Sequence, residues 1–127
     1  NVDLAQGPCV IKRLRGCGAG CEYVAITPEG DIYPCHQFVG NEDYKLGSLY
    51  DGTFDQELSG RFAGLNIYTR EECRDCWARF YCSGGCSASN LLVNGDIKKP
   101  HRVGCELERK RLECAIALRA IAAGMAE

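Results

Sequence analysis

Four cysteines lie close together in the segment ECRDCWARFYCSGGC, which spans residues 72–86, at the spacing C-x2-C-x5-C-x3-C. Thiolates are soft ligands that bind zinc and iron, and the two glycines before the last cysteine let the backbone fold back. Zinc sites commonly use two well-separated pairs of ligands, whereas iron–sulfur sites draw cysteines from one compact run. The spacing therefore predicts a metal site and favours an iron–sulfur cluster. A zinc site and a set of disulfide bridges are the alternatives.

A second group of cysteines flanks a predicted β-hairpin. Apolar residues on both sides of the turn residues 28–31 indicate two short antiparallel strands. Cys17 and Cys21 precede the first strand, and Cys35 follows the second. Because a hairpin brings the outer ends of its strands together, the three thiols can approach one point. We interpret them as a second candidate metal site.

Helices and loops must position these cysteines. Thr53 with Gln56 resembles a capping box that opens a helix reaching about residue 62, and Thr69 with Glu72 resembles another that leads into the cysteine run. A short strand is possible over residues 45–49. After the run, the sequence predicts a short helix that ends near residues 94–95.

The last predicted helix extends from about residue 104 to 123 and has apolar side chains on two nearly opposite faces. One face carries Leu107, Cys114, Leu118, Ile121 and Met125, and the other carries Cys105, Leu112 and Ile116. We expect the second face to cover a metal cluster that Cys105 ligates. The first face would pack elsewhere in the core or on a partner.

Composition narrows the class of protein. A length of 127 residues predicts one domain, and the net charge of -2 argues against general nucleic-acid binding. No apolar run is long enough to cross a membrane, and the metal-like grouping of the ten cysteines favours a cytoplasmic protein over a secreted disulfide scaffold. Because the chain begins with Asn1 rather than Met, we expect it to be a piece of a longer protein.

The whole cysteine pattern resembles the seven-cysteine signature of the SPASM domain, a C-terminal extension of radical S-adenosylmethionine enzymes that modify peptides. The matching residues are Cys17, Gly30, Cys35, Cys73, Cys76, Cys82, Cys86 and Cys105. With the predicted elements, the resemblance implies an α+β fold in which an N-terminal β-hairpin is followed by helices and loops around two metal clusters and by a long C-terminal helix. It implies an N-terminal linker over residues 1–16, the cluster domain over 17–105 and the C-terminal helix over 106–127.

The resemblance also implies two [4Fe-4S] clusters as cofactors. The first would be held by Cys17, Cys35 and Cys86, and the second by Cys73, Cys76, Cys82 and Cys105. Cys21 is a candidate fourth ligand of the first cluster, since it lies four residues after Cys17. The alternative is that Cys21 is a free thiol and that the fourth position is open to a substrate thiolate.

Longer stretches, among them CRDCWARFYCSGGC and NGDIKKPHRVGCELERKRLECAIA, are similar to the maturases of SCIFF peptides. This narrower resemblance implies a role in forming thioether cross-links in a ribosomal peptide, either by electron relay or by binding the substrate thiolate. The C-x3-C-x2-C loop of radical S-adenosylmethionine chemistry is missing, because the third position after Cys21 is Val24 and the third position after Cys86 is Ser89. We therefore expect no catalytic residues here. The expected partners are a catalytic barrel, which would bind S-adenosylmethionine, and a cysteine-containing precursor peptide. A structural zinc-binding interaction module is the alternative function.

Overall fold

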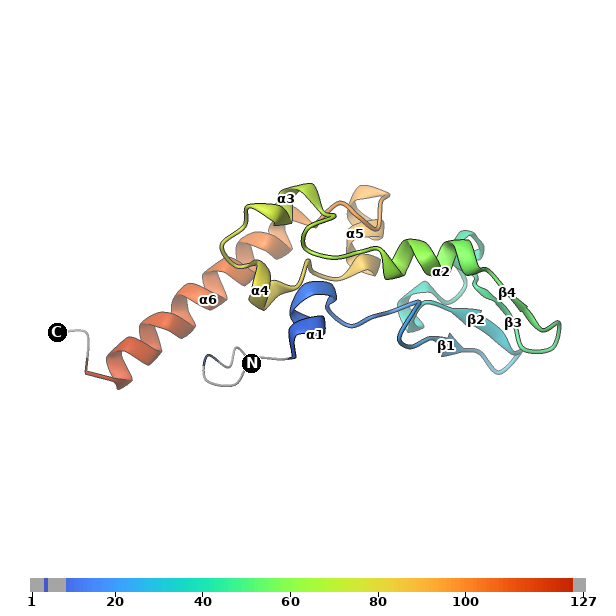
Figure 1. Cartoon of the computed structure of the whole chain (residues 1–127), viewed down its shortest axis with the longest axis horizontal. Helices are drawn as coiled ribbons and strands as arrows, with labels where there is room; N and C mark the ends of the chain where they lie inside the picture. The colour runs from blue at the N-terminus through green and yellow to red at the C-terminus, as the bar shows by residue number, and fades with distance from the viewer. Residues whose placement is uncertain (1–3, 5–8, 125–127) are drawn as a thin grey trace. The chain divides into compact units, whose positions relative to one another are not determined.

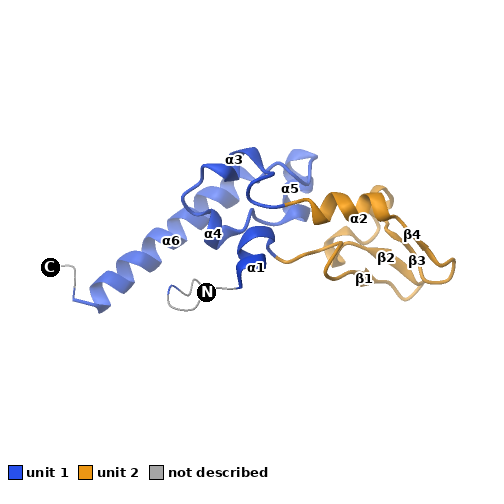
Figure 2. Ribbon diagram, in the orientation of Figure 1, with its two compact units in different colours: residues 1–16, 66–127 blue, residues 17–65 orange. Residues whose placement is uncertain are grey.

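The computed structural model of the chain describes Leu4 and residues 9–124. The chain divides into two compact units, shown in Figure 2. The sheet unit comprises residues 17–65, and the helical unit comprises residues 1–16 together with residues 66–127. Each unit has its own secondary structure and its own buried side chains, and each carries part of the predicted ligand set.

The sheet unit contains four short antiparallel strands in the order β1-β2-β3-β4 (Figure 1). They are β1 (Ala25–Ile26), β2 (Asp31–Tyr33), β3 (Gly47–Ser48) and β4 (Thr53–Phe54). Ile26 pairs with Ile32 across the predicted turn, so the hairpin is confirmed. The strand β3 falls within the stretch 45–49, where the sequence predicts a short strand.

The helix of the sheet unit, α2 (Gln56–Ala63), begins later than the sequence predicts. Thr53 belongs to β4 and pairs with Ser48, so it is not available as a helix cap. Asp55 is the cap instead, because its carboxylate accepts a hydrogen bond from the Leu58 amide at 2.8 Å. The predicted capping box at Thr53 is therefore wrong, although the helix itself is confirmed.

Aromatic rings form the centre of the sheet unit. The ring of Phe38, in the 3-10 helix η1 (His36–Phe38), lies 5.1 Å from that of Tyr44, in η2 (Glu42–Tyr44), and 5.4 Å edge-on from that of Phe62. Such edge-to-face pairs stabilise a core beyond the area that they bury. Other buried apolar residues of this unit are Ile32, Tyr33, Leu46, Leu58 and Leu65. The sheet unit therefore has a continuous apolar core of its own.

The helical unit is built from short helices joined by tight turns, followed by one long helix (Figure 1). They are α1 (Val10–Arg15), α3 (Glu71–Arg74), α4 (Arg79–Cys82), α5 (Ser87–Asn94) and α6 (Arg102–Ala122). After α4 the backbone enters the left-handed region at Ser83, Gly84 and Gly85, with φ of 60°, 88° and 74°. Glycine adopts this conformation without strain, which explains the sharp turn between Cys82 and Cys86. Gly95 ends α5 in the same way, as predicted.

The predicted capping box at Thr69 is also wrong. The residue at the cap position of α3 is Arg70, and the Thr69 hydroxyl instead accepts a hydrogen bond from the Asn66 amide at 2.9 Å. Asn66 and Thr69 therefore stabilise the turn that precedes α3, a common use of short polar side chains.

The long helix α6 begins two residues before the predicted start and has one fully buried side chain among its described residues, that of Leu112. The other predicted stripe is exposed at Leu107, Cys114, Leu118 and Ile121, so its burial within this chain is wrong. Met125 lies outside the described residues. The described helices include none with the length and apolar character needed to span a membrane.

Candidate metal centre

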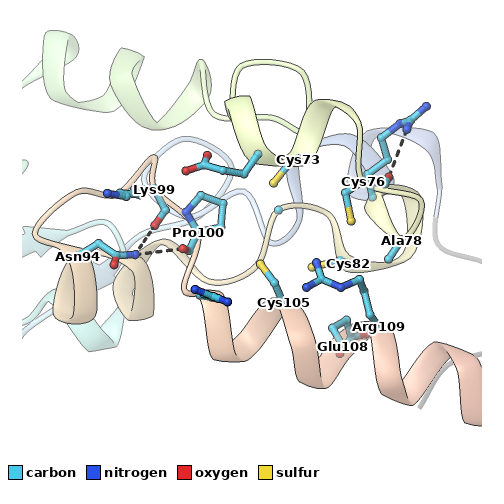
Figure 3. A pocket seen from close by; sticks show the side chains of 14 residues that line it. Cys73, Cys76, Ala78, Cys82, Asn94, Lys99, Pro100, Cys105, Glu108 and Arg109 are labelled. Atoms are coloured by element: carbon cyan, nitrogen blue, oxygen red, sulfur yellow. Dashed lines mark hydrogen bonds between the residues drawn. The ribbon is translucent and has the colours of Figure 1, made fainter.

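Four cysteines of the helical unit border one cavity of about 410 Å³. Figure 3 shows the sulfur atoms of Cys73, Cys76, Cys82 and Cys105 pointing into a common space. Three of them come from the compact run, and Cys105 comes from the start of α6. The structure therefore brings together the four residues that the resemblance assigns to the second cluster.

Local backbone structure delivers each of these thiols. Cys73 lies in α3, and the Cys76 amide donates a hydrogen bond to the Cys73 carbonyl at 3.1 Å, which closes the turn between them. Cys82 is the last residue of α4, and its amide bonds to the Ala78 carbonyl at 2.9 Å. Cys105 lies in the first turn of α6. Short helices with sharp ends thus present the four thiols.

The thiols are held in a low-polarity environment. Burial raises the pKa of Cys73 to about 11, against the lowering effect of the nearby Arg70 guanidinium. Burial also raises the pKa of Cys82 and of Cys105, and the guanidinium of Arg109 opposes this in the case of Cys105. Neighbouring thiolates disfavour each other further. The protein alone therefore favours neutral thiols, and positively charged metal is needed before all four become thiolates.

The donor set and the space fit an iron–sulfur cluster. In a tetrahedral zinc site the Zn–S bonds are about 2.3 Å long, so the four sulfurs crowd around one point. Among the described residues, no group of three or more His, Cys, Asp or Glu side chains is placed to hold a metal ion. The four thiols border one cavity, and four cysteine thiolates are the usual ligand set of a [4Fe-4S] cluster.

Cys86, the remaining cysteine of the compact run, lies elsewhere. It is exposed at the start of α5 and borders an adjoining cavity of about 290 Å³ rather than the larger one. Cys82 and Cys105 border both cavities. Three of the four cysteines of the run therefore border the larger cavity, and the fourth does not.

In the sheet unit, Cys17 and Cys35 both lie beside the hydroxyl of Tyr23. Partial burial and then the charges of these two cysteines raise the pKa of Tyr23 to about 12. Cys35 is buried where β2 ends, and Cys17 is exposed. Cys21 has a different contact, because its exposed thiol donates a hydrogen bond to the Gly18 carbonyl at 3.4 Å. The hairpin thus places Cys17 and Cys35 around one phenol.

Several charged residues near the four thiols escaped the sequence analysis. Arg79, Arg109 and Glu108 border the larger cavity, and Arg70 packs against Gly84, which also borders it. Arg109 could have been found, since it is four residues after Cys105 and therefore on the same face of α6. No sequence signal marks Arg70, because its hydrogen-bond partners lie 17 to 28 residues away.

Two cysteines, Cys9 and Cys114, are not assigned to either candidate site. Cys9 and Cys114 are exposed, as solvent-facing free thiols. The described residues include all ten cysteines, and no disulfide bond joins any two of them.

Comparison with known proteins identifies similar chains. The chain is 31% identical over 101 residues to an uncharacterized protein from Archaeoglobus fulgidus, covering 76% of this chain and 24% of the relative. It is 28% identical over 102 residues to a PqqA peptide cyclase from Xanthomonas axonopodis pv. citri, covering 75% of this chain and 27% of the relative. It is also 28% identical over 86 residues to a serine-type anaerobic sulfatase-maturating enzyme from Klebsiella aerogenes, covering 65% of this chain and 20% of the relative. The chain thus spans about a quarter of the length of these relatives.

A family model described as the SPASM iron–sulfur cluster-binding domain matches residues 17–77. The match includes the hairpin cysteines and the first two cysteines of the compact run, and it ends before Cys82, Cys86 and Cys105. The chemistry of the four thiols around the larger cavity agrees with this description. Residues 17–77 of the chain therefore belong to the SPASM family of iron–sulfur cluster-binding domains.

Proposed function

We propose that this chain is the auxiliary cluster domain of a cytoplasmic radical S-adenosylmethionine enzyme that modifies a ribosomal peptide, and that it binds two [4Fe-4S] clusters. The single observation that carries the proposal is the set of four thiols around one cavity in the helical unit. The names of two relatives, a peptide cyclase and a sulfatase-maturating enzyme, describe enzymes that act on polypeptides.

The proposed ligands of the second cluster are Cys73, Cys76, Cys82 and Cys105. Their convergence from three helices and a turn supplies one thiolate for each iron, and their partial burial limits the access of water. Arg70 and Arg109 add positive charge near the thiolates, which favours their charged form.

The proposed ligands of the first cluster are Cys17, Cys21, Cys35 and Cys86. The shared neighbour Tyr23 supports the inclusion of Cys17 and Cys35, since its phenol can donate hydrogen bonds to two ligating thiolates. Cys21 and Cys86 enter the proposal from the SPASM resemblance. Both are exposed, so neither has to leave a packed core in order to bind iron.

When bound, a [4Fe-4S] cluster supplies one-electron transfer and, if one iron lacks a protein ligand, a position for a substrate thiolate. With Cys21 as a ligand, both sites of this chain are closed and the residues serve an electron relay. If Cys21 is not a ligand, the first site can receive a thiolate from the peptide. In either case the thioether cross-link would form in a larger protein, because the chain lacks the C-x3-C-x2-C loop.

The proposed partners are the radical S-adenosylmethionine catalytic barrel and a cysteine-containing precursor peptide. The relatives are about four times as long as the matched part of this chain, which leaves room in them for a catalytic domain. The exposed stripe of α6 offers an apolar surface that no described residue of the chain covers.

The test is the iron and acid-labile sulfide content of the anaerobically purified chain, together with its visible spectrum. We expect a brown protein with about eight irons and eight sulfides per chain. A colourless protein that contains zinc, and that gains no iron on anaerobic reconstitution, would contradict the proposal in favour of a structural zinc module.

A matched substitution then decides the role of Cys21. We expect Cys21→Ala to change the spectrum of the first cluster and to make a thiol peptide perturb that spectrum, because one iron loses its protein ligand. Cys114→Ala is the control, since Cys114 is equally exposed and lies outside the proposed ligand set. An iron content and spectrum that match those of the control would remove Cys21 from the ligand list.

A further inference from the structure

Arg70 is a buried cation within the helical unit. Only 4% of its surface is exposed, although arginine is rarely so buried unless its charge is balanced. It stands at the start of α3, three residues before Cys73. Its position therefore raises the question of what balances the charge.

The hydrogen-bond partners of the Arg70 guanidinium are all neutral. Nη1 donates to the carbonyl of Ile97 at 2.6 Å and to that of Lys98 at 2.8 Å, and Nη2 donates to the Ser87 hydroxyl at 3.0 Å. Within the described part of the chain, Arg70 takes part in no ion pair, whereas the cations that do include Lys45, Arg102, Lys110 and Arg111. Hydrogen bonds to neutral groups satisfy the donors but do not by themselves balance the positive charge.

These contacts join three segments that carry proposed ligands. Ser87 directly follows Cys86, and the loop of Ile97 and Lys98 leads to α6 and Cys105. The third segment is the turn after Cys82. A Cβ atom at Gly84 would lie 2.9 Å from Nε of Arg70 and 3.0 Å from its Cδ, so the bare glycine backbone packs directly against the side chain.

Both thiols and carboxylates act on this charge. Burial lowers the pKa of Arg70, and the opposing effects come, in decreasing order, from Cys73, Asp96, Cys82 and Glu72. Four thiolates around an iron–sulfur cluster carry a net negative charge, and one further electron increases it. This negative charge stabilises a buried cation beside it and offsets the free energy lost by burying the Arg70 guanidinium.

We propose that Arg70 is a positioning residue for the second cluster, which fixes the ligand segments and places a permanent positive charge behind the thiolates of Cys73 and Cys82. The inference rests on the proposed function, because the charge has this role only if a cluster is bound. A fixed positive charge in a water-poor site stabilises the reduced cluster more than the oxidised one. Arg70 therefore raises the midpoint potential of the second cluster.

The test is a redox titration of the anaerobically purified chain, followed by electron paramagnetic resonance. Loss of one midpoint in Cys76→Ala identifies the potential that belongs to the second cluster. In Arg70→Gln we expect that potential to shift to more negative values while the other midpoint stays unchanged. Arg70→Lys keeps the charge and loses the fork of donors, so we expect a potential close to that of the wild type and a lower melting temperature.

Arg74→Gln is the matched control, since Arg74 adjoins Cys73 in sequence but is exposed. Water and salt screen its charge, so we expect almost no shift in either midpoint. Loss of the second cluster in Arg70→Gln but not in Arg70→Lys would also support the proposal, because the two differ in charge.

The proposal is overturned if Arg70→Gln keeps the wild-type potential, or if Arg70→Lys and Arg70→Gln behave alike. Failure of the proposed function is a separate result, since the wild-type chain would then hold no iron at all.

Discussion

The two units of the molecule present their cysteines in different ways. In the sheet unit, Cys35 follows a strand of a four-stranded sheet whose core contains Phe38 and Phe62. In the helical unit, the four cysteines surround a cavity, and the segments that carry them are joined largely through Arg70. The first arrangement is a packed framework with ligands attached to it. The second is a set of short segments with polar connections around a space.

This difference indicates which ligand set depends more on its metal. Apolar burial is the main favourable term in folding, and the sheet unit buries several large apolar side chains. The segment from Arg70 to Cys105 buries Ile97 as its one large apolar side chain, besides the small residues Ala78 and Ala88. Metal ligation must therefore contribute more to the folding of the helical site than to that of the sheet.

Removal of iron is the strongest test of this comparison. After anaerobic chelation we expect amide hydrogens of the cysteine segment, such as that of Cys82, to exchange rapidly because the short helices have little other support. The Leu46 amide, which donates to the Ile32 carbonyl at 2.7 Å, should stay protected. Hydrogen exchange measured by mass spectrometry compares the protection of amides in the helical unit with that of amides in the sheet unit. Equal loss of protection in both units would break the comparison.

Loss of one ligand should affect one cluster at a time. We expect Cys76→Ala to remove about four irons per chain and to leave the cluster of the hairpin cysteines, because the two ligand sets share no residue. Cys35→Ala should produce the reverse and, in addition, a small loss of stability, because Cys35 is buried near the sheet. Iron analysis with electron paramagnetic resonance tests both. Loss of all the iron in either variant would show that the clusters assemble together.

Local signals in the sequence were sufficient for part of this fold. The hairpin is predicted because Ile26 and Ile32 flank turn residues, and the end of α5 is predicted because Gly95 adopts the left-handed conformation. The hairpin and the helix end are both determined by residues that are close together in sequence, so the sequence alone predicts them. The capping boxes at Thr53 and Thr69 failed because tertiary and turn contacts engage these residues differently, in strand pairing with Ser48 and in a turn with Asn66.

The candidate site was predictable to a similar degree. Cysteine spacing identifies the ligand types. The SPASM resemblance groups Cys105 with Cys73, Cys76 and Cys82, and the structure shows these four around one cavity. The role of Arg70 was not predictable, since its contacts depend on how distant loops fold back on α3. The exposure of Leu107 and Leu118 was not predictable either, because periodicity marks an apolar face but does not say what covers it.

The two halves of α6 allow a test of the packing within the helical unit. We expect Leu112→Ala to lower the free energy of unfolding by about 2–5 kcal/mol, because it leaves a cavity at a fully buried site. Leu118→Ala is the control, since its side chain is 68% exposed, and it should change stability by less than about 0.5 kcal/mol. Urea denaturation of the iron-loaded chain measures both. A large effect of Leu118→Ala would mean that the exposed stripe is covered in solution.

The smallest expected effect concerns the helix cap of the sheet unit. Asp55→Ala removes the acceptor of the Leu58 amide and should destabilise the unit by about 1 kcal/mol. Asp55→Asn should restore most of this loss, because asparagine caps helices about as well as aspartate does. Thermal melting, monitored by circular dichroism, measures the loss of stability. Iron analysis then shows whether the helical unit is affected as well. Since α2 belongs to the sheet unit, Asp55→Ala should leave the iron bound by Cys73, Cys76, Cys82 and Cys105 unchanged. Loss of that iron would show that the helical site depends on the sheet framework, and the two units would then fold as one.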